Sequence, residues 1–257
     1  INYALDRDEI TELAYEGSTF SAFAPLSAFG EIQKYEERLA SVIDSYDVDN
    51  QDVDMVAEIM ESKGYSSNAD GFWANSDGVF ELDLQSQPGN PMGPIIIQQL
   101  QDAGFDARLE VTQGASFIEN ARTGNFNMHL WVHCGSVYDP YQTLEHYHGD
   151  YAVPMGEKVA SLRAYTRYSN PELDAILDEM AGMVPSPDDP EYLDLVGQAL
   201  AIYFEDLPDI TIGEERQVFV MNETYWTNWP TKDDPYMHPV PPWEGYARII
   251  HQLEPVQ

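Results

Sequence analysis

Residues 79–132 alternate between strand-like and helix-like patterns, and this alternation constrains the fold more than any other feature of the sequence. From Val79 to Leu84, side chains facing the two sides of the chain differ in polarity, as in a half-buried strand. We expect strands at 79–84, 105–111 and 126–132, separated by helices at 90–103 and 116–122. Because the connections are short, the strands must pack through right-handed crossovers. The pattern therefore predicts an α/β fold with a mainly parallel sheet flanked by helices.

Helical patterns lie on both sides of this region. Helices are predicted at 6–17, 37–46, 50–64, 173–184 and 192–203. Asn50 and Asn170 are the predicted N-caps of two of them, because their side chains can accept hydrogen bonds from free backbone N–H groups. Two more strands are predicted after the last helix, at 210–212 and 217–221.

The segment from Tyr225 to Glu254 is rich in proline and tryptophan. Aromatic side chains need burial, so we expect an ordered wrapping segment rather than a linker. Trp73, in the turn-rich stretch 70–78, is interpreted as a packing residue. The chain starts at Ile1 without a methionine, which indicates an internal start within a longer polypeptide.

The balance of charges excludes several classes of function. The 257 residues include 45 Asp+Glu and 12 Lys+Arg, a net charge of −33. Such a surface repels nucleic-acid phosphates and anionic lipids, and the longest apolar run falls far short of the roughly 20 residues of a membrane span. We therefore expect no nucleic-acid partner and no membrane span. Because the acid is spread along the chain, it favours a solvated surface suited to high salt, and a saline habitat is our hypothesis.

Metal and catalytic signatures are weak. Cys134 is the only cysteine, which excludes an intrachain disulfide and a cysteine-rich zinc site. Four of the six histidines fall within twenty residues: His129, His133, His146 and His148. Imidazoles can bind nickel or zinc, but strand and loop positions need not converge, so we predict no metal and no cofactor. An enzyme is a remote alternative, since the sequence has no nucleophile elbow, phosphate loop or zinc-protease motif.

Six short segments follow one another along almost the whole chain. They are NYALDRDEI at 2–10, AEIMESKGY at 57–65, IQQLQDAGF at 97–105, GNFNM with Trp131 at 124–131, RYSNPELD at 167–174 and DLPDI at 206–210. In this order they resemble the family 5 extracellular solute-binding proteins of ABC transporters. That family includes oligopeptide-, dipeptide-, nickel- and oligosaccharide-binding proteins.

The resemblance implies a fold and a function. Family members have two α/β lobes around a cleft and are longer than this chain. Residues 1–212 would form the second lobe, of the type II periplasmic-binding-protein kind, and residues 213–257 would be a C-terminal segment that returns to the first lobe. The protein would capture a small solute outside the cytoplasmic membrane, in the periplasm or extracellular space, and pass it to ABC permease subunits without making or breaking a bond. An N-terminal anchor missing from this chain would hold it at the membrane.

Trp131 is the main candidate for the ligand site. It ends the third predicted strand, and open α/β sheets bind ligands outside the carboxyl ends of their strands. The residues alone favour a core tryptophan, whereas the resemblance implies that the indole faces the ligand and stacks on it. His133 and Cys134 follow on the same segment. Peptide-binding relatives have an acidic residue at the position of Cys134 to hold the peptide's amino group, and a thiol cannot replace it, which favours a neutral ligand.

Four further residues complete the predicted site. Arg167 and Tyr168 either reach the cleft or, for the arginine, form an ion pair with one of the many acids. Residues 225–236 resemble the ending of relatives that bind β-linked oligosaccharides, and there Trp226 and Trp229 would stack on the ligand or pack between lobes. We therefore predict an oligosaccharide ligand. An oligopeptide is the alternative, and nickel or a metal chelate is a more remote one.

Overall fold

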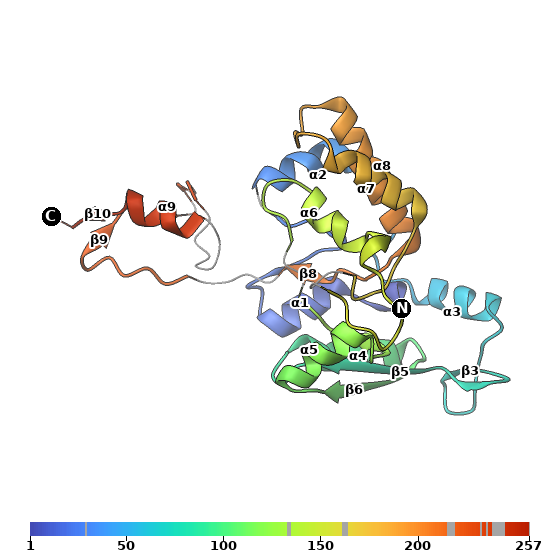
Figure 1. Cartoon of the computed structure of the whole chain (residues 1–257). Coiled ribbons are helices and arrows are strands. Elements are labelled where there is room, and N and C mark those ends of the chain that lie inside the picture. The colour runs from blue at the N-terminus through green and yellow to red at the C-terminus, as the bar shows by residue number, and fades with distance from the viewer. Residues whose placement is uncertain are drawn as a thin grey trace. The chain divides into compact units, whose positions relative to one another are not determined.

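The computed structural model divides the chain into two compact units, Ile1–Glu214 and Glu215–Gln257 (Figure 1). It describes residues 1–28, 30–132, 135–160, 164–214, 219–231, 233–234, 236–237 and 245–256, with residues 245 and 246 described by backbone alone. The division falls two residues after the boundary expected from the resemblance, and the assignment of the parts to two lobes stays a prediction.

The first unit contains a parallel three-stranded sheet in the order β6–β5–β7. Its strands are β5 (Glu81–Ser86), β6 (Asp106–Val111) and β7 (Met128–His129), connected by α4 (Met92–Asp102) and α5 (Gly114–Thr123). Leu84 of β5 pairs with Leu109 on one side and Met128 on the other. The predicted fold class, α/β with a mainly parallel sheet flanked by helices, is confirmed.

Two strands of this sheet, the central β5 and the outer β7, differ in extent from the prediction. β5 begins at Glu81, because Gly78–Val79 instead forms β4 of a small antiparallel sheet with β2 (Ser66–Ser67) and β3 (Trp73–Asn75). β7 covers two residues rather than seven. Its last contact with β5 is the hydrogen bond from Leu130 N to Gln85 O, 2.8 Å long, after which the chain leaves the sheet.

Trp73 packs as interpreted from the sequence. Its side chain is 9% exposed, and its indole N–H donates to the carbonyl of Ala103 at 2.7 Å. Gly104 lies beside it with φ +87°, and a Cβ at that position would approach Trp73 Nε1 to 2.9 Å. Only glycine therefore lets the turn after α4 close against the indole.

The described part of the first unit has five further long helices: α1 (Arg7–Tyr15), α2 (Gly30–Ile43), α3 (Val53–Ser62), α7 (Pro171–Ala181) and α8 (Pro190–Asp206). Four of them, α1, α3, α7 and α8, begin at an acidic or amide cap. The predicted cap Asn170 is confirmed, since its Oδ1 accepts from Glu172 N at 2.9 Å. The predicted cap Asn50 is wrong: Asp52 caps α3 by accepting from Met55 N at 2.8 Å, because Asp52 is the residue next to the first helical turn. Among the described residues, no helix is long and apolar enough to cross a membrane.

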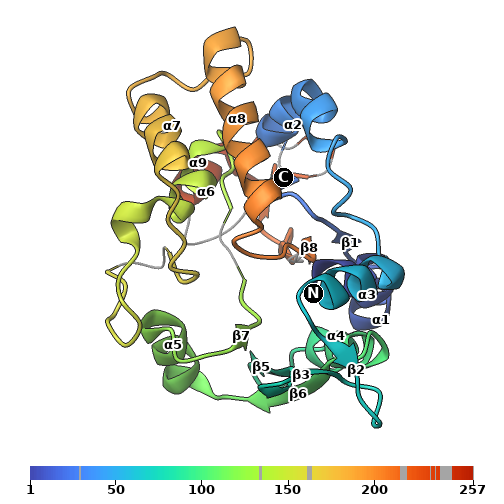
Figure 2. The ribbon, with the colours of Figure 1, turned by 90° about the vertical axis from the view of Figure 1, so that its right-hand side faces the viewer.

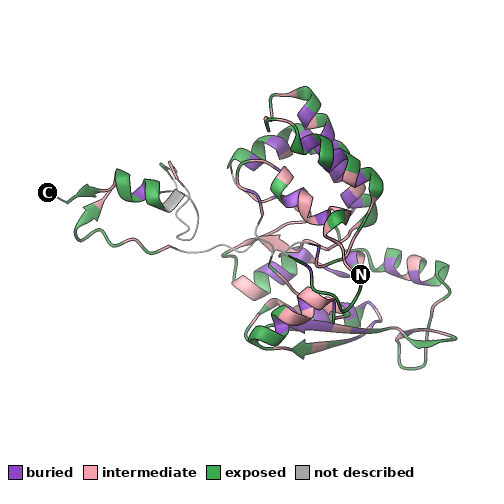
Figure 3. Ribbon diagram, viewed as in Figure 1, coloured by how far each residue is buried: buried purple, intermediate pink, exposed green. Residues whose placement is uncertain are grey.

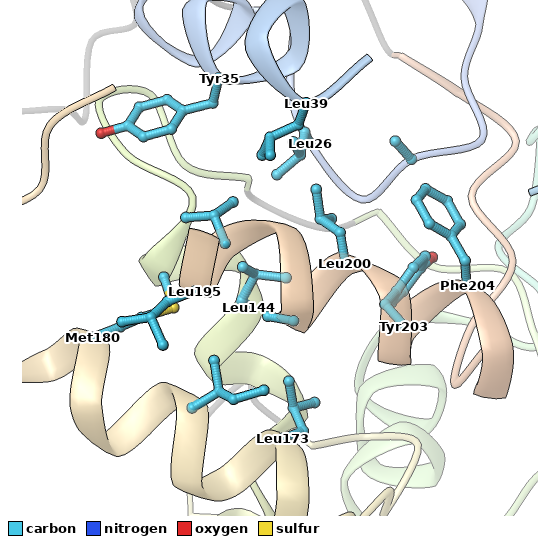
Figure 4. Packing of buried hydrophobic residues seen from close by; sticks show 14 of the residues in the cluster. Leu26, Tyr35, Leu39, Leu144, Leu173, Met180, Leu195, Leu200, Tyr203 and Phe204 are labelled. Carbon is cyan, nitrogen blue, oxygen red and sulfur yellow. The ribbon is translucent and has the colours of Figure 1, made fainter. Parts of the chain in front are cut away.

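The first unit has two hydrophobic cores, and its buried residues lie mainly in them (Figure 3). The sheet core lies among α1, α3, α4 and strands β5 and β6, and includes Ile96, Leu100 and Phe105. The helical core lies among α2, α6 (Tyr141–Leu144), α7 and α8, and includes Leu144, Leu173, Leu200 and Tyr203 (Figure 4). Figure 2 shows the helices of the helical core gathered at one end of the unit and the sheet with α4 and α5 at the other.

Short elements complete the first unit. They are η1 (Asn2–Ala4), η2 (Glu145–Tyr147), η3 (Gly149–Tyr151), and the antiparallel pair β1 (Phe20–Ser21) and β8 (Gly213–Glu214). The strand predicted at 210–212 is thus displaced to 213–214. Of the strand predicted at 217–221, residues 217 and 218 lie outside the described residues, and 219–221 form no strand.

The second unit contains one helix and one strand pair in its described part. Strands β9 (Trp226–Thr227) and β10 (Glu254–Pro255) are antiparallel, and α9 (Gly245–Gln252) precedes β10. Ile249 of α9 is fully buried. The side chain of Asn228, at φ +66°, donates to the carbonyl of Gln252 at 2.7 Å and so ties the turn after β9 to the end of the helix.

Candidate functional site

Trp131 lies where the sequence predicted it, just beyond the carboxyl end of β7. The ends of β5 and β6 share this edge, because all three strands are parallel. In open α/β sheets, ligands bind in the crevice outside the carboxyl ends of the strands. Trp131 therefore lies at the predicted edge of the sheet, and its role toward a ligand stays a prediction.

The indole of Trp131 is half-buried and sits among three other rings. Phe117 of α5 stacks with it at a centroid distance of 5.6 Å and an interplanar angle of 25°. Tyr165 meets it edge-on at 5.2 Å and 76°, and His129 lies 5.7 Å away. These contacts hold the indole in one orientation while leaving part of it exposed. A tryptophan held in this way can offer a rigid surface for stacking.

His129 belongs to this aromatic group. Its ring stacks on Phe117 at 4.0 Å, and its Nε2 lies 3.3 Å from the carbonyl oxygen of Phe117. Burial lowers the pKa of His129, because the charged imidazolium is poorly solvated there. The ring is therefore neutral at pH 7.

A buried amide positions α5 and, through it, Phe117. Gln85 at the end of β5 is 5% exposed. Its Nε2 donates to Glu110 Oε2 at 3.0 Å and to Asn125 O at 3.2 Å, and its Oε1 accepts from Asn120 Nδ2 at 3.0 Å. This network joins β5, β6 and α5. The position of Phe117, which stacks with Trp131, therefore depends on hydrogen bonds that span the sheet.

Arg167 contacts main-chain carbonyls, and no carboxylate among the described residues pairs with it. Its guanidinium donates to Tyr165 O at 3.0 Å, to Arg122 O at 2.9 Å and to Glu157 O at 3.1 Å. The Arg122 carbonyl belongs to the last turn of α5, where a cation offsets the negative end of the helix dipole. The ion pair considered from the sequence is therefore replaced by a contact that holds the end of α5.

Tyr168 lies against the helical core. Its hydroxyl donates to Asp206 at the end of α8, and Asn170 Nδ2 reaches the same carboxylate at 3.0 Å. Burial, and the nearby carboxylate of Asp206, raise the pKa of Tyr168 to about 12. In this arrangement the tyrosine ties the start of α7 to the end of α8.

Only some of the other predicted positions lie within the described residues. His133 and Cys134 lie outside the described residues. His148 lies between two aspartates of α7, with Nε2 3.4 Å from Asp178 Oδ1. Among the described residues, no group of three or more His, Cys, Asp and Glu side chains is arranged to hold a metal ion.

Trp226 and Trp229 belong to the second unit. Trp226 is 50% exposed in β9, and the indole N–H of Trp229 donates to its carbonyl at 3.1 Å. The hydroxyl of Tyr236 donates to Asn228 O at 2.6 Å in the same turn. The two tryptophans therefore form one local aromatic structure, and their role toward a ligand stays a prediction.

The structure adds residues that sequence reasoning missed. Phe117 and Tyr165 contact Trp131 directly, and Arg122 contacts Arg167. Phe117 is a buried residue of a predicted helix. Its burial was therefore foreseeable, but its contact with Trp131 was not. Tyr165 lies in an irregular segment two residues before the RYSNPELD motif, where no periodicity indicates which way a side chain faces.

A surface groove of about 420 Å³ lies elsewhere, between α7 and α8. Carboxylates of Glu172, Glu179, Glu191 and Asp194 line it over an apolar floor. None of the predicted site residues lies in this groove. It is a part of the acidic surface rather than of the site around Trp131.

Comparison with known proteins bears on the whole chain. Residues 1–153 match the profile of the bacterial extracellular solute-binding proteins, family 5 (middle part). A comparison with curated protein sequences gives no match.

Solved structures share the fold over almost the full chain. A periplasmic oligopeptide-binding protein from Thermotoga maritima superposes with a TM-score of 0.83 at 23% identity, over 99% of this chain and 48% of that one. Its mannohexaose-bound form gives 0.81 at the same identity and coverage. The oligopeptide-binding protein AppA of Bacillus subtilis, with a nonapeptide, gives 0.66 at 18% identity over 82% of this chain and 40% of that one. The chain thus spans about half the length of the Thermotoga protein.

Proposed function

This chain belongs to family 5 of the bacterial extracellular solute-binding proteins, and we propose that it captures a small solute for an ABC-type importer. The solute is bound outside the cytoplasmic membrane and passed to permease subunits, and no covalent bond changes. Residues 1–212 act as the second lobe, and residues 213–257 return to the first. Capture follows from closure of two lobes around the solute, which excludes water from its polar groups.

The setting of Trp131 carries this proposal. Its indole is half-buried at the carboxyl edge of a parallel sheet and is held by Phe117 and Tyr165. A rigid aromatic surface at this edge suits a ligand with a flat apolar face. Because the chain spans about half of a relative's length, it supplies one wall of the binding cleft and binds weakly on its own.

We propose an oligosaccharide as the solute. Sugar rings present flat C–H faces that stack on indoles. The similarity to a mannohexaose-bound structure, the cysteine at position 134 and the ending at 225–236 support this choice. An oligopeptide is the second candidate, supported by the similarity to peptide-binding structures.

Thermal shift of the complete gene product tests the proposal. The panel contains neutral oligosaccharides, short peptides, and nickel with and without chelators, all in high salt. A ligand at 100 times its dissociation constant adds about 2.7 kcal/mol of stability, which a melting curve resolves easily. A shift with sugars supports the proposed solute, a shift with peptides alone replaces it, and no shift with any of them contradicts the proposed function.

Two substitutions of Trp131 test whether the ligand stacks on its indole. Trp131→Ala should weaken binding by about 1–3 kcal/mol, because it removes the stacking surface, whereas Trp131→Phe should retain most of the affinity. Val184→Ala is a surface control, since Val184 is 83% exposed in the loop between α7 and α8. Equal affinities for all three variants and the unmodified protein would remove Trp131 from the site.

A further inference from the structure

The second unit contains the sequence Asn222-Glu223-Thr224, which matches the acceptor pattern for N-linked glycosylation. The pattern requires an asparagine, then any residue except proline, then a serine or threonine. No other asparagine of the chain has a serine or threonine two positions after it. Because the pattern is short, its meaning depends on how the structure presents these three residues.

All three residues are exposed, in a turn that leads into β9. Their surroundings are exposed as well: Val220 on one side is 91% exposed and Tyr225 on the other is 74% exposed. An attached oligosaccharide is bulky and hydrated, and therefore needs a position of this kind at the surface. The segment thus meets the steric requirement for the modification.

The side chain of Asn222 is held in an Asx turn. Its Oδ1 accepts from the backbone N–H of Thr224 at 2.9 Å. Within the part of the chain that the structure describes, no hydrogen bond engages Nδ2 of Asn222 or the hydroxyl of Thr224. Removal of a proton from Nδ2 places negative charge on Oδ1, and the N–H of Thr224 already points at that oxygen. The turn therefore favours the amide nitrogen as a nucleophile and leaves the hydroxyl available to a transferase.

We propose that Asn222 is the attachment site of an N-linked oligosaccharide. The donor is an oligosaccharide whose C1 is bonded to the phosphate of a lipid carrier. Nδ2 of Asn222 attacks C1, so that a C1–Nδ2 bond forms, and the C1–O bond breaks with its electron pair leaving on the lipid phosphate. A base of the transferase takes the proton from Nδ2. This inference rests on the location in the proposed function, outside the cytoplasmic membrane, and not on the identity of the solute.

Asn75 provides a comparison within the same chain. Its Oδ1 accepts from the backbone N–H of Asp77 at 2.8 Å, which is the same Asx turn. The residue two positions after it is an aspartate, so the hydroxyl of the acceptor pattern is missing. We therefore expect sugar on Asn222 and none on Asn75.

Mass spectrometry of the complete gene product, purified from its own source organism, tests the proposal. Trypsin cleaves after Arg216 and Lys232, so one peptide contains both Asn222 and Asn228, and Asn228 lacks the acceptor pattern. We expect this peptide to be heavier by whole sugar residues, and fragmentation to place the sugar on Asn222. A peptide of unmodified mass, or sugar on Asn228 or on a threonine instead, would overturn the inference. Sugar on Asn75 would also overturn it, because the turn alone would then be sufficient.

Variants assign the modification to the acceptor pattern. Asn222→Gln and Thr224→Ala should each abolish the added mass, and Thr224→Ser should retain it, because serine also supplies a hydroxyl. Asp77→Ala, the equivalent substitution in the turn of Asn75, is the matched control and should leave the added mass unchanged. An added mass that persists in Asn222→Gln or in Thr224→Ala would contradict the proposal.

Solute binding, measured by calorimetry on the same variants, separates this inference from the proposed function. The substituted positions are exposed, so affinity for the solute should stay within about twofold of the unmodified protein. Sugar on Asn222 in a protein that binds none of the tested solutes would support this inference and count against the proposed function. Solute binding by a protein without the sugar would do the reverse.

Discussion

The two cores of the first unit differ in the sequence separation of the elements that form them. The sheet core is assembled mainly from β5, α4 and β6, which follow one another directly. The helical core joins α2 to α7 and α8, and the Arg38–Asp188 ion pair beside it links positions 150 residues apart. Sequence patterns therefore predict well the order of the elements that form the sheet core. The helical core depends instead on contacts between segments far apart in the sequence.

Truncation of one buried leucine in each core should have the largest effect. Leu100 and Leu200 are both fully buried, so Leu100→Ala and Leu200→Ala should each lower the free energy of unfolding by about 2–5 kcal/mol. Because both cores belong to one compact unit, both variants should lower the same thermal transition, measured by calorimetry. Leu13→Ala, at a position 61% exposed, is the control. Two transitions that respond separately would show that the cores unfold independently.

Loss of Asp209 should destabilise the first unit through the helical core. Its carboxylate accepts from the hydroxyls of Tyr147 and Tyr203, both at 2.8 Å. Burial raises the pKa of both tyrosines well above the usual range, so both act as neutral donors. Asp209→Ala should cost about 2–3 kcal/mol in urea denaturation, because it removes this acceptor from two buried hydroxyls. A cost below about 0.5 kcal/mol would mean that water replaces the carboxylate.

Gly124 tests the contact that holds the end of α5. It has φ +74°, and a Cβ there would lie 2.6 Å from Arg167 Cζ. Gly64 has φ +84° but no atom within 4 Å of such a Cβ. Gly64→Ala should therefore cost about 1 kcal/mol from backbone strain alone, and Gly124→Ala about twice that. Equal losses in denaturant titrations would show that Arg167 moves aside freely.

The smallest expected effect is a pH dependence in α2. Burial, and then the charge of Glu214, raise the pKa of Glu36 to about 7. Folding therefore favours the protonated form, and the stability from this group is complete below about pH 4.5 and is lost as the pH rises through about 7. Glu36→Gln should raise the melting temperature at pH 8, by about 1 kcal/mol of stability at most because solvent screens the half-buried group, and change little at pH 4. A melting temperature unchanged at both pH values would contradict this.

Much of the fold could be predicted because its causes are local. The alternation over 79–132 predicts the parallel sheet and both crossover helices, and Asn170 was foreseen as a cap because capping involves neighbouring residues. Strand ends were less predictable. β7 stops at His129, and β5 ends one residue further along this register, at Ser86, so β5 offers no partner for residues 131 and 132.

The site around Trp131 was likewise predictable only in part. Its place at the carboxyl edge of the sheet follows from strand order, which the sequence predicted. Its neighbours do not: Phe117 comes from the preceding helix, and Tyr165 from an irregular segment that follows much later. Arg167 was interpreted as a cleft or ion-pair residue, yet its guanidinium donates to the carbonyl of Arg122 in the last turn of α5, a contact that no local pattern specifies.

The sequence by itself determined the α/β class, the order of sheet and helices and the family, because these depend on periodicity and motif order. Only the tertiary structure decided which rings hold Trp131 and which main-chain carbonyls Arg167 contacts. Those facts depend on side chains that meet across large separations in sequence, where packing and hydrogen bonding select partners that no local pattern specifies.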